Sequence, residues 1–254
     1  MGTHYGGTSS FVPPQALAAS FAAAPQPAMR RYEVRGMTPD GTPQDFARAM
    51  PADPHVDEAF CAFAHGTLIA TPQGPVAVED LAPGMTVETA GAGPQPLLWV
   101  GSTVLAPPTD RRGEIPVLTR ITADSLGLGR PMPDLVLGPR ARMLVRHPGC
   151  RALTGAEAAF APATGFVDGM ALIALRVVRP TRVFHLALSG QQVLLANGVE
   201  VESYHPGENA SLLIDNGNRM RFLSLFPHVS GFSGFGAMPV PRLNAFELDG
   251  LNAA

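Results

Sequence analysis

The stretch of sequence that decides the fold is residues 66–87, GTLIATPQGPVAVEDLAPGMTV. It contains three runs of apolar and β-branched residues, at 67–71, at 76–81 and from Met85 onward. The turn sequences Pro-Gln-Gly and Pro-Gly separate these runs. Short β-type runs that end at Gly and Pro are typical of strands joined by tight turns. Residues 66–87 therefore predict consecutive short strands.

The same pattern continues outward on the C-terminal side of this stretch. Asn197-Gly198 is a strong signal for a hairpin turn, and residues 199–202 alternate strictly between apolar and acidic side chains. Short runs recur along the chain without long segments of helical period, so the sequence predicts an all-β architecture. Further runs of this kind lie at 97–101, with Trp99 as an expected core residue, and at 115–122, 135–137, 143–146, 171–178, 183–188 and 193–196.

Only a few segments favour helix. We expect short helical segments at 123–126 and 155–161, and a helical turn at 44–50. Before that turn, residues 31–41 predict a short strand that ends in a turn. Residues 51–60, which are rich in Pro and acidic side chains, predict a linker.

The changes of pattern predict three parts. Residues 1–61 are an N-terminal extension and linker, residues 62–205 are the β domain, and residues 206–254 are a C-terminal tail. We expect both end parts to be irregular, with residues 1 to about 28 a flexible tail. The C-terminal part carries aromatic and Met side chains that either cover an apolar edge of the sheet or dock a protein partner. These side chains are Phe222, Phe226, Phe232, Phe235 and Met238.

Composition argues against several classes of function. The 254-residue chain has a net charge of −3 and no basic run, so nothing in it favours nucleic-acid binding. It has no run of about 18 apolar residues that would span a membrane. Its two cysteines, Cys61 and Cys150, allow one disulfide but lack the spacing of a zinc site. We therefore predict no metal and no other cofactor.

The N-terminal residues bear on localisation. No Arg or Lys precedes Arg30, and three prolines interrupt the apolar stretch before it, which argues against a secretory signal. The pair Arg30-Arg31 is followed by Tyr-Glu-Val-Arg, which argues against a twin-arginine signal. The sequence predicts a protein that stays in the cytoplasm or leaves by a route other than Sec.

Residues 66–87 are similar to the opening of bacterial Hedgehog/intein (Hint) domains, and four later segments resemble that family in the same order. The later segments are 95–101, 134–145, 183–198 and 202–207. Five ordered segments make a fairly specific match, whereas any one of them alone would be weak. The resemblance implies the twisted β fold of Hint domains for the centre of the chain.

The resemblance also implies a chemistry. In an active Hint domain, a Cys or Ser at the first position attacks the carbonyl of the preceding peptide bond, which becomes a thioester or an ester. A nearby His protonates the departing amide nitrogen, because an unprotonated amide is a very poor leaving group. Water, a hydroxyl group or another side chain then resolves the ester.

The positions that carry this chemistry in the family are vacant in this chain. The nucleophile position, four residues before Gly66, is occupied by Ala62. The Ser and His of the family's SPQH segment fall on Gly138 and Ala141, and the His often found shortly before the sequence ANG falls near Gln191. The resemblance therefore implies a degenerate autoprocessing domain that acts as a rigid β binding or structural module.

Two other hypotheses stay open from the residues alone. Cys61 lies one residue before the nucleophile position, and a one-residue step along a strand turns a side chain to the opposite face. If the chain bulges there, Cys61 could act with His147 as a substitute acid, and the chain would cleave itself near Cys61-Ala62 through a thioester. In the second hypothesis, residues 1–50 are a cargo that the domain releases.

Two further histidines favour structural roles. His185 lies in an apolar run and is predicted to be a hydrogen-bonded residue of a strand. His205 is followed by Pro206 and Gly207, where a splicing domain would need an Asn that cyclises. We therefore predict that the chain does not splice.

Overall fold

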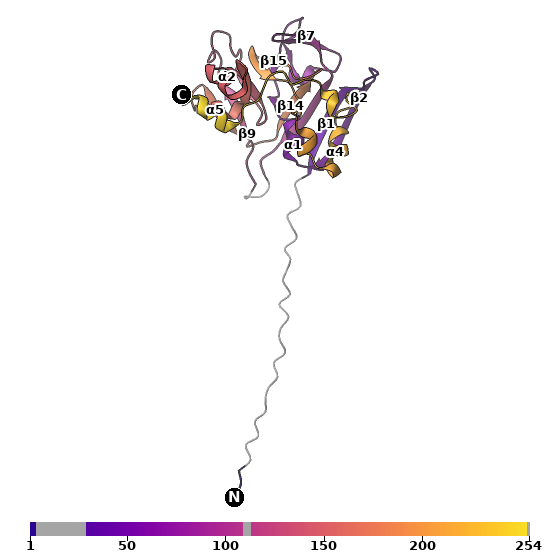
Figure 1. Ribbon diagram of the computed structural model, residues 1–254, viewed down its shortest axis with the longest axis vertical. Helices are drawn as coiled ribbons and strands as arrows, with labels where there is room; N and C mark the ends of the chain where they lie inside the picture. The colour runs from indigo at the N-terminus through magenta and orange to yellow at the C-terminus, as the bar shows by residue number, and fades with distance from the viewer. Residues whose placement is uncertain (4–28, 109–112, 253–254) are drawn as a thin grey trace.

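The computed structural model describes residues 1–3, 29–108 and 113–252. The predicted tail at residues 4 to about 28 lies outside the described residues. The described part of the chain is mostly β-structure, arranged as two eight-stranded antiparallel sheets with short helices on the outside (Figure 1). The all-β prediction is confirmed. No helix among the described residues is long and apolar enough to cross a bilayer.

The first sheet has the strand order β13-β9-β10-β3-β14-β8-β1-β2. Its centre is the pair of β8 and β14, whose register matches Gly101 with His185. The strands of this sheet are β1 (Met29–Met37), β2 (Pro43–Pro51), β3 (Phe63–Ala64), β8 (Trp99–Leu105), β9 (Val117–Ile121), β10 (Leu135–Leu137), β13 (Leu172–Arg176) and β14 (Thr181–Ala187).

The second sheet has the order β12-β11-β16-β15-β4-β5, with β6 paired to β15 and β7 paired to β6. Asn197 and Gly198, with φ angles of 49° and 83°, make the predicted turn between β15 and β16. The strands of this sheet are β4 (Leu68–Ile69), β5 (Val76–Ala77), β6 (Thr86–Thr89), β7 (Gly93–Pro96), β11 (Arg142–Arg146), β12 (Ala158–Pro162), β15 (Val193–Ala196) and β16 (Val199–Glu202).

Two large apolar clusters hold the fold together. The inner cluster draws on both sheets, with Phe63 and Leu137 from the first and Ile69 and Val201 from the second. The outer cluster covers the other face of the first sheet, where Trp99 donates a 2.7 Å hydrogen bond to the carbonyl oxygen of Leu225. Successive residues of one strand, such as Val183 and Phe184 of β14, therefore belong to different clusters, as a period of two requires.

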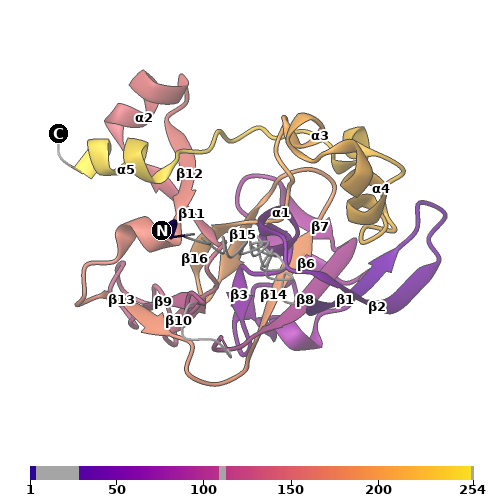
Figure 2. The ribbon, with the colours of Figure 1, turned by 90° about the horizontal axis from the view of Figure 1, so that it is seen from below.

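The N-terminal part forms a hairpin that extends the first sheet. β1 pairs with β8 on one side and with β2 on the other (Figure 2). The prediction of a helical turn at 44–50 is therefore wrong. Its Gln, Ala, Arg and Met residues have good helix propensity, but pairing along the whole of β1 outweighs that weak preference. The division of the chain at residue 61 stays a prediction.

The helices lie outside the segments in which the sequence predicts them. Residues 123–126 form turns, and residues 155–161 lead into β12, so both predicted helices are wrong. The helix of this region is α2 (Pro148–Thr154), which begins at a proline and ends at Gly155 in the left-handed conformation. Proline at the start and glycine after the end are normal helix signals. In the predicted linker, α1 (Pro54–Glu58) is capped by the Asp53 carboxylate.

The C-terminal part packs onto the rest of the molecule. It contains α3 (Ala210–Leu213), α4 (Asn216–Leu223), a 3₁₀ turn (Phe232–Phe235) and α5 (Ala245–Asn252). Phe222, Phe226 and Phe235 are buried in the outer cluster. α5 lies against α2 and β12 through Leu248 and Leu251. The C-terminal part is therefore attached to the sheets through the outer cluster and through the contacts of α5.

Candidate functional site

The junction between Cys61 and Ala62 sits where the two apolar clusters meet. Ala62 is fully buried in the inner cluster, whereas Cys61 is buried in the outer cluster. The two side chains therefore face opposite ways, as the one-residue step predicts. A methyl group at position 62 brings no nucleophile to the carbonyl before it.

The backbone of this junction is fully hydrogen-bonded. The N–H of Ala62 donates to the carbonyl oxygen of Phe184 at 2.9 Å. The carbonyl oxygen of Cys61 accepts from the N–H of Arg140 at 2.9 Å, and that of Ala62 accepts from the N–H of Gly138 at 2.7 Å. The peptide unit is thus fixed in the sheet, which stabilises it in its planar amide form.

Gly138, at the family's Ser position, lies against this peptide bond. A Cβ atom placed on Gly138 would lie 2.3 Å from the oxygen and 2.7 Å from the carbon of the Cys61 carbonyl. No real Cβ contact is that short, so no residue with a side chain fits here unless the backbone moves. The glycine therefore lets the turn at residues 138–140 approach the junction closely, so that the N–H groups of Gly138 and Arg140 both reach it.

Ala141, at the family's His position, is 2% exposed and belongs to the inner cluster. Its N–H donates to the carbonyl oxygen of Gly138, and its carbonyl oxygen accepts from the N–H of Ala163. The side chain is a methyl group among apolar neighbours. Position 141 therefore offers no proton to a leaving nitrogen.

The thiol of Cys61 is poorly suited to attack. Burial raises the pKa of this thiol well above its ordinary value, and the Asp57 carboxylate raises it further. Only the thiolate is an effective nucleophile, so the group is unreactive near neutral pH. A thiol at this position would act on the carbonyl of Phe60, one bond before the junction that precedes Ala62. The charged neighbours of this thiol are Asp57, Arg30 and Arg140.

His147, which was predicted as a substitute acid, caps a helix in the structure. Its Nδ1 accepts a 3.1 Å hydrogen bond from the N–H of Gly149, so it caps α2 at its N-terminus. Cys150, on α2, is buried in a third cluster with Leu243 and Leu248. Cys150 and Cys61 are both free, so the disulfide that the sequence allowed is not formed.

His185 is buried beside the junction, next to Phe184. Its ring lies edge-on to Phe63 and Tyr204, with centroids 5.7 Å and 5.4 Å away. Burial, together with the charges of Arg142 and Arg242, lowers the pKa of His185 to about 3. Its Nδ1 accepts from the N–H of Leu186. A ring that stays neutral near pH 7 is a poor proton donor to an amide nitrogen.

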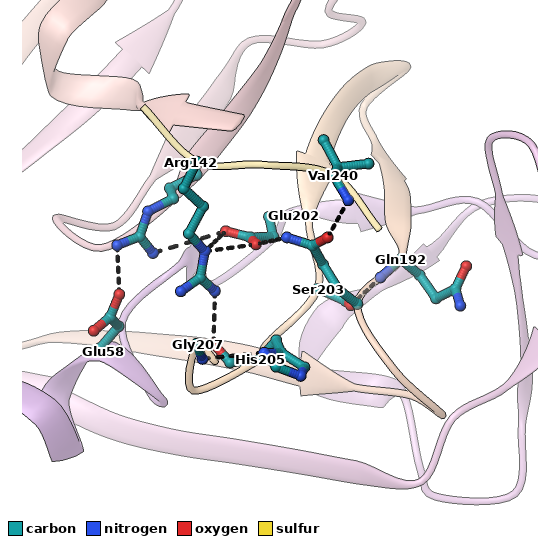
Figure 3. A network of polar contacts seen from close by, with 10 residues as sticks. Glu58, Arg142, Gln192, Glu202, Ser203, His205, Gly207 and Val240 are labelled. Atoms are coloured by element: carbon teal, nitrogen blue, oxygen red, sulfur yellow. Dashed lines mark hydrogen bonds and ion pairs between the residues drawn. The ribbon is translucent and has the colours of Figure 1, made fainter. Parts of the chain in front are cut away.

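Gln191 joins a polar network around the buried carboxylate of Glu202, which the sequence does not reveal; Figure 3 shows this network with Glu58, Arg142 and Val240. Gln191 is 1% exposed, donates through Nε2 to Glu202 and accepts through Oε1 from the N–H of Val240 at 2.9 Å. Arg242 donates from Nε to both oxygens of Glu202, at 2.9 Å and 3.2 Å. The remaining charged members are Arg142, 3.7 Å from Glu202, and Glu58, which pairs with Arg142.

The sequence held a weak signal for this network. Residues 199–202 alternate, which places Val199 and Val201 inside and predicts both glutamates outside. Glu200 follows that rule, but Glu202 is 3% exposed because its carboxylate finds cations from β11 and from the C-terminal segment. Those partners lie far away in sequence. No cluster of three or more His, Cys, Asp or Glu that could hold a metal occurs within the described ranges.

Solved structures similar to this chain are inteins and an intein-like domain. A bacterial intein-like domain from Clostridium thermocellum is 14% identical, with a TM-score of 0.38, and the match covers 57% of this chain and 99% of that domain. The MchDnaB-1 intein is 14% identical, with a TM-score of 0.33 and coverage of 56% and 100%. The gp41-1 intein is 13% identical, with a TM-score of 0.31 and coverage of 56% and 98%.

The comparison with curated proteins found no match. The family model described as "Hint domain" matches residues 61–208, which is more than half of the chain. The match begins at Cys61 and ends just beyond the His205-Pro206-Gly207 segment. It contains all five segments on which the sequence resemblance rests. The chain therefore belongs to the Hint domain family.

Proposed function

We propose that this Hint domain does not cleave itself and serves as a rigid β module for binding or assembly. The observation that carries the proposal is the state of the Cys61–Ala62 junction. A methyl group stands at the nucleophile position, and a second one stands at the acid position, Ala141. Self-cleavage needs a nucleophile, a proton donor and room for the carbonyl to become tetrahedral.

The lack of room for the carbonyl to become tetrahedral also counts against cleavage. Gly138 already packs against the Cys61 carbonyl, and the N–H of Arg140 holds the carbonyl oxygen at 2.9 Å. A hydrogen bond to this oxygen would stabilise an oxyanion if an attacking group were present. Without such a group, the same bond stabilises the planar amide. The remnant of the site therefore supports a structural role.

The proposal is tested by the intact mass of the full-length chain over several days at neutral pH. One sample is kept in buffer, and two others contain hydroxylamine or dithiothreitol, which resolve esters and thioesters. We expect a single unchanged mass in all three. A steady rise of fragments that end or begin between residues 60 and 62 would contradict the proposal.

Two variants decide between the proposal and the thioester alternative if fragments form. Cys61→Ala removes the only thiol next to the junction, and Cys150→Ala is the matched control on α2. Cleavage lost in Cys61→Ala and kept in Cys150→Ala would establish attack by Cys61. For the release of residues 1–50 as cargo, a reporter protein fused ahead of Met1, which keeps β1 and β2 in place, should remain attached under our proposal.

A further inference from the structure

The C-terminal segment 236–243, which we call the strap, crosses the molecule in an extended form between two helical regions. Before it, Phe235 is buried in the outer cluster, and at its end Leu243 is buried in the third cluster with Cys150. Between these two anchors, Gly236, Ala237 and Pro239 are exposed. The strap is therefore attached at its ends and only lightly covered along its length.

The strap adds to the edge of the second sheet. The N–H of Phe160, on edge strand β12, donates to the carbonyl oxygen of Pro241 at 2.8 Å. The N–H of Leu243 donates to the carbonyl oxygen of Phe160 at 2.8 Å, so Phe160 and Arg242 form a parallel bridge. Addition of an extended peptide to a sheet edge is a common mode of peptide recognition, in which main-chain bonds supply affinity.

Side chains on the domain recognise the strap from the other side. Gln191 forms two hydrogen bonds with the strap, both 2.9 Å long. Its main-chain N–H donates to the carbonyl oxygen of Ala237, and its side-chain Oε1 accepts from the N–H of Val240. The Nε of Arg242 donates to both oxygens of the Glu202 carboxylate. The guanidinium of Arg242 also donates, through Nη2, to the carbonyl oxygen of His205 at 2.6 Å. Main-chain pairing thus sets the direction of the strap, and the Glu202 carboxylate binds the side chain of Arg242.

Open space lies on both sides of the strap. A pocket of about 330 Å³ is lined by Glu58, Arg142 and Tyr204, and a second of about 490 Å³ is lined by His205 and Ser233. Met238 lines both pockets, so the strap passes between them. A segment with few buried apolar contacts opens at a lower free energy than the core around it.

We propose that Phe160, Gln191 and Glu202 form a groove that binds extended peptides with an arginine followed by an apolar residue, and that the strap is its intramolecular ligand. If the strap leaves, the buried carboxylate of Glu202 loses the guanidinium of Arg242 and keeps only Gln191 and Arg142, and the Oε1 of Gln191 loses the N–H of Val240. Buried polar groups without partners are costly, so the open groove favours another chain of the same chemistry. The inference does not depend on whether the junction at residue 61 is cleaved.

A labelled peptide in trans tests the groove with the full-length chain. The probe is a fluorescein-labelled peptide of residues 236–246, GAMPVPRLNAF, and its binding is followed by fluorescence polarisation. The wild-type chain should not bind it, because the tethered strap has a much higher effective concentration. Arg242→Ala, which weakens the strap, should bind the peptide saturably. Arg221→Ala, a change at an exposed arginine of α4, is the matched control and should behave like wild type.

A second peptide tests the role of the arginine. The same probe with alanine in place of its arginine should bind the Arg242→Ala chain at least tenfold more weakly. Equal binding of the two peptides, or no binding of either, would overturn the proposal. Hydrogen exchange of residues 237–243 should also be faster in the Arg242→Ala chain than in wild type, and unchanged exchange would overturn the role of Arg242 as the latch.

If the Arg242→Ala chain does not fold, the same test uses a wild-type chain that is cut by a protease after folding. A protease site inserted between the exposed residues Ser233 and Gly234 is cut after folding, which leaves the strap bound but no longer tethered. We expect the cut protein to exchange its strap for an excess of labelled peptide, and the uncut protein to remain free of it. A folded, cut protein that takes up no peptide after prolonged incubation would refute the groove.

Discussion

Ala62 and Gly138 are two small residues that pack tightly around one peptide unit of the core. Both are packed at the same peptide unit, one through a methyl group and the other through its backbone. A larger side chain at either position would need space that the core has already filled. Positions 62 and 138 are thus well-packed parts of the core, and neither leaves a cavity for a larger side chain.

The first prediction concerns the nucleophile position. Ala62→Cys alone should leave the chain whole over several days, because an apolar site raises the pKa of the new thiol and Ala141 offers no acid. Intact mass spectrometry in the presence of hydroxylamine is the measurement. Ala64→Cys, two residues further on in β3 and also buried, is the control. Fragmentation of Ala62→Cys with an intact control would show that the remaining site is still competent.

The second prediction concerns Gly138. Gly138→Ala should reduce the free energy of unfolding by roughly 1–3 kcal/mol, as overpacking of a dense core does. The expected clash is with the carbonyl of Cys61, 2.3 Å from the new Cβ. Gly231→Ala, with nothing within 4 Å of its Cβ, should change stability by less than about 0.5 kcal/mol. Urea unfolding measures both, and equal effects would contradict the packing argument.

The sequence resemblance singled out individual positions, but it could not describe their surroundings. Alignment with family motifs pointed to Ala62 and Ala141, and the one-residue step placed Cys61 on the other face. It could not show that Gly138 and Arg140 contact the Cys61 carbonyl, because those contacts join segments that are distant along the chain. Nor could it show the burial that makes the Cys61 thiol unreactive.

At the scale of elements, strands with a clear pattern were predictable and those set by their neighbours were not. The Asn197-Gly198 turn and the alternating β16 follow from local chemistry. β2 does not, because only its pairing with β1 overrides the helix propensity of residues 44–50. The start of α2 was predictable in principle from Pro148 and Gly155, which mark a helix start and end.

The third prediction concerns His228, in the segment after α4. Its ring lies edge-on to Phe226 and Phe235, and neither ring nitrogen has a hydrogen-bond partner within the described part of the chain. Burial lowers the pKa of His228 to about 4. The unfolded chain, with a pKa near 6.5, binds a proton first as pH falls. The stabilising contribution of this neutral ring is therefore complete above about pH 6.5 and is lost as pH falls towards 4.

His228→Phe should remove this contribution to the pH dependence. The loss of stability between pH 7 and pH 4 should be smaller in the variant than in wild type, by on the order of 2–3 kcal/mol. His55→Phe changes an exposed histidine of α1 and should keep the wild-type profile. Urea unfolding at each pH measures the difference. Parallel profiles for wild type and His228→Phe would show that the buried ring has no such effect.

At the scale of the whole molecule, aromatic side chains join all parts of the chain. Tyr32 of β1 packs on Phe60, Phe60 packs on Trp99 of β8, and Trp99 packs on Phe226 after α4, with centroids 4.8 Å, 5.2 Å and 5.0 Å apart. The outer cluster therefore ties the N-terminal hairpin and the C-terminal helices to one sheet. Composition predicted a core of this size, but not that residues far outside the Hint match would complete it.

The fourth prediction is that these parts unfold together. Trp99 is the only tryptophan and is fully buried among the hairpin, β8 and the tail, so its fluorescence reports on that contact. Unfolding in urea followed by Trp99 fluorescence and by far-ultraviolet circular dichroism should give coincident transitions, as for one cooperative unit. An earlier fluorescence transition would show instead that the end parts detach while the two sheets persist.

The bond between residues 61 and 62 is expected to remain an ordinary amide. The chain contains a single Cys-Ala dipeptide, Cys61-Ala62, so labelling cysteine carbonyls with ¹³C and alanine nitrogens with ¹⁵N marks this bond alone. An HNCO spectrum of the folded, full-length protein should show one peak that keeps its intensity for days. Decay of that peak in a chain that stays folded would contradict the account, because a cut between residues 61 and 62 breaks this carbon–nitrogen bond.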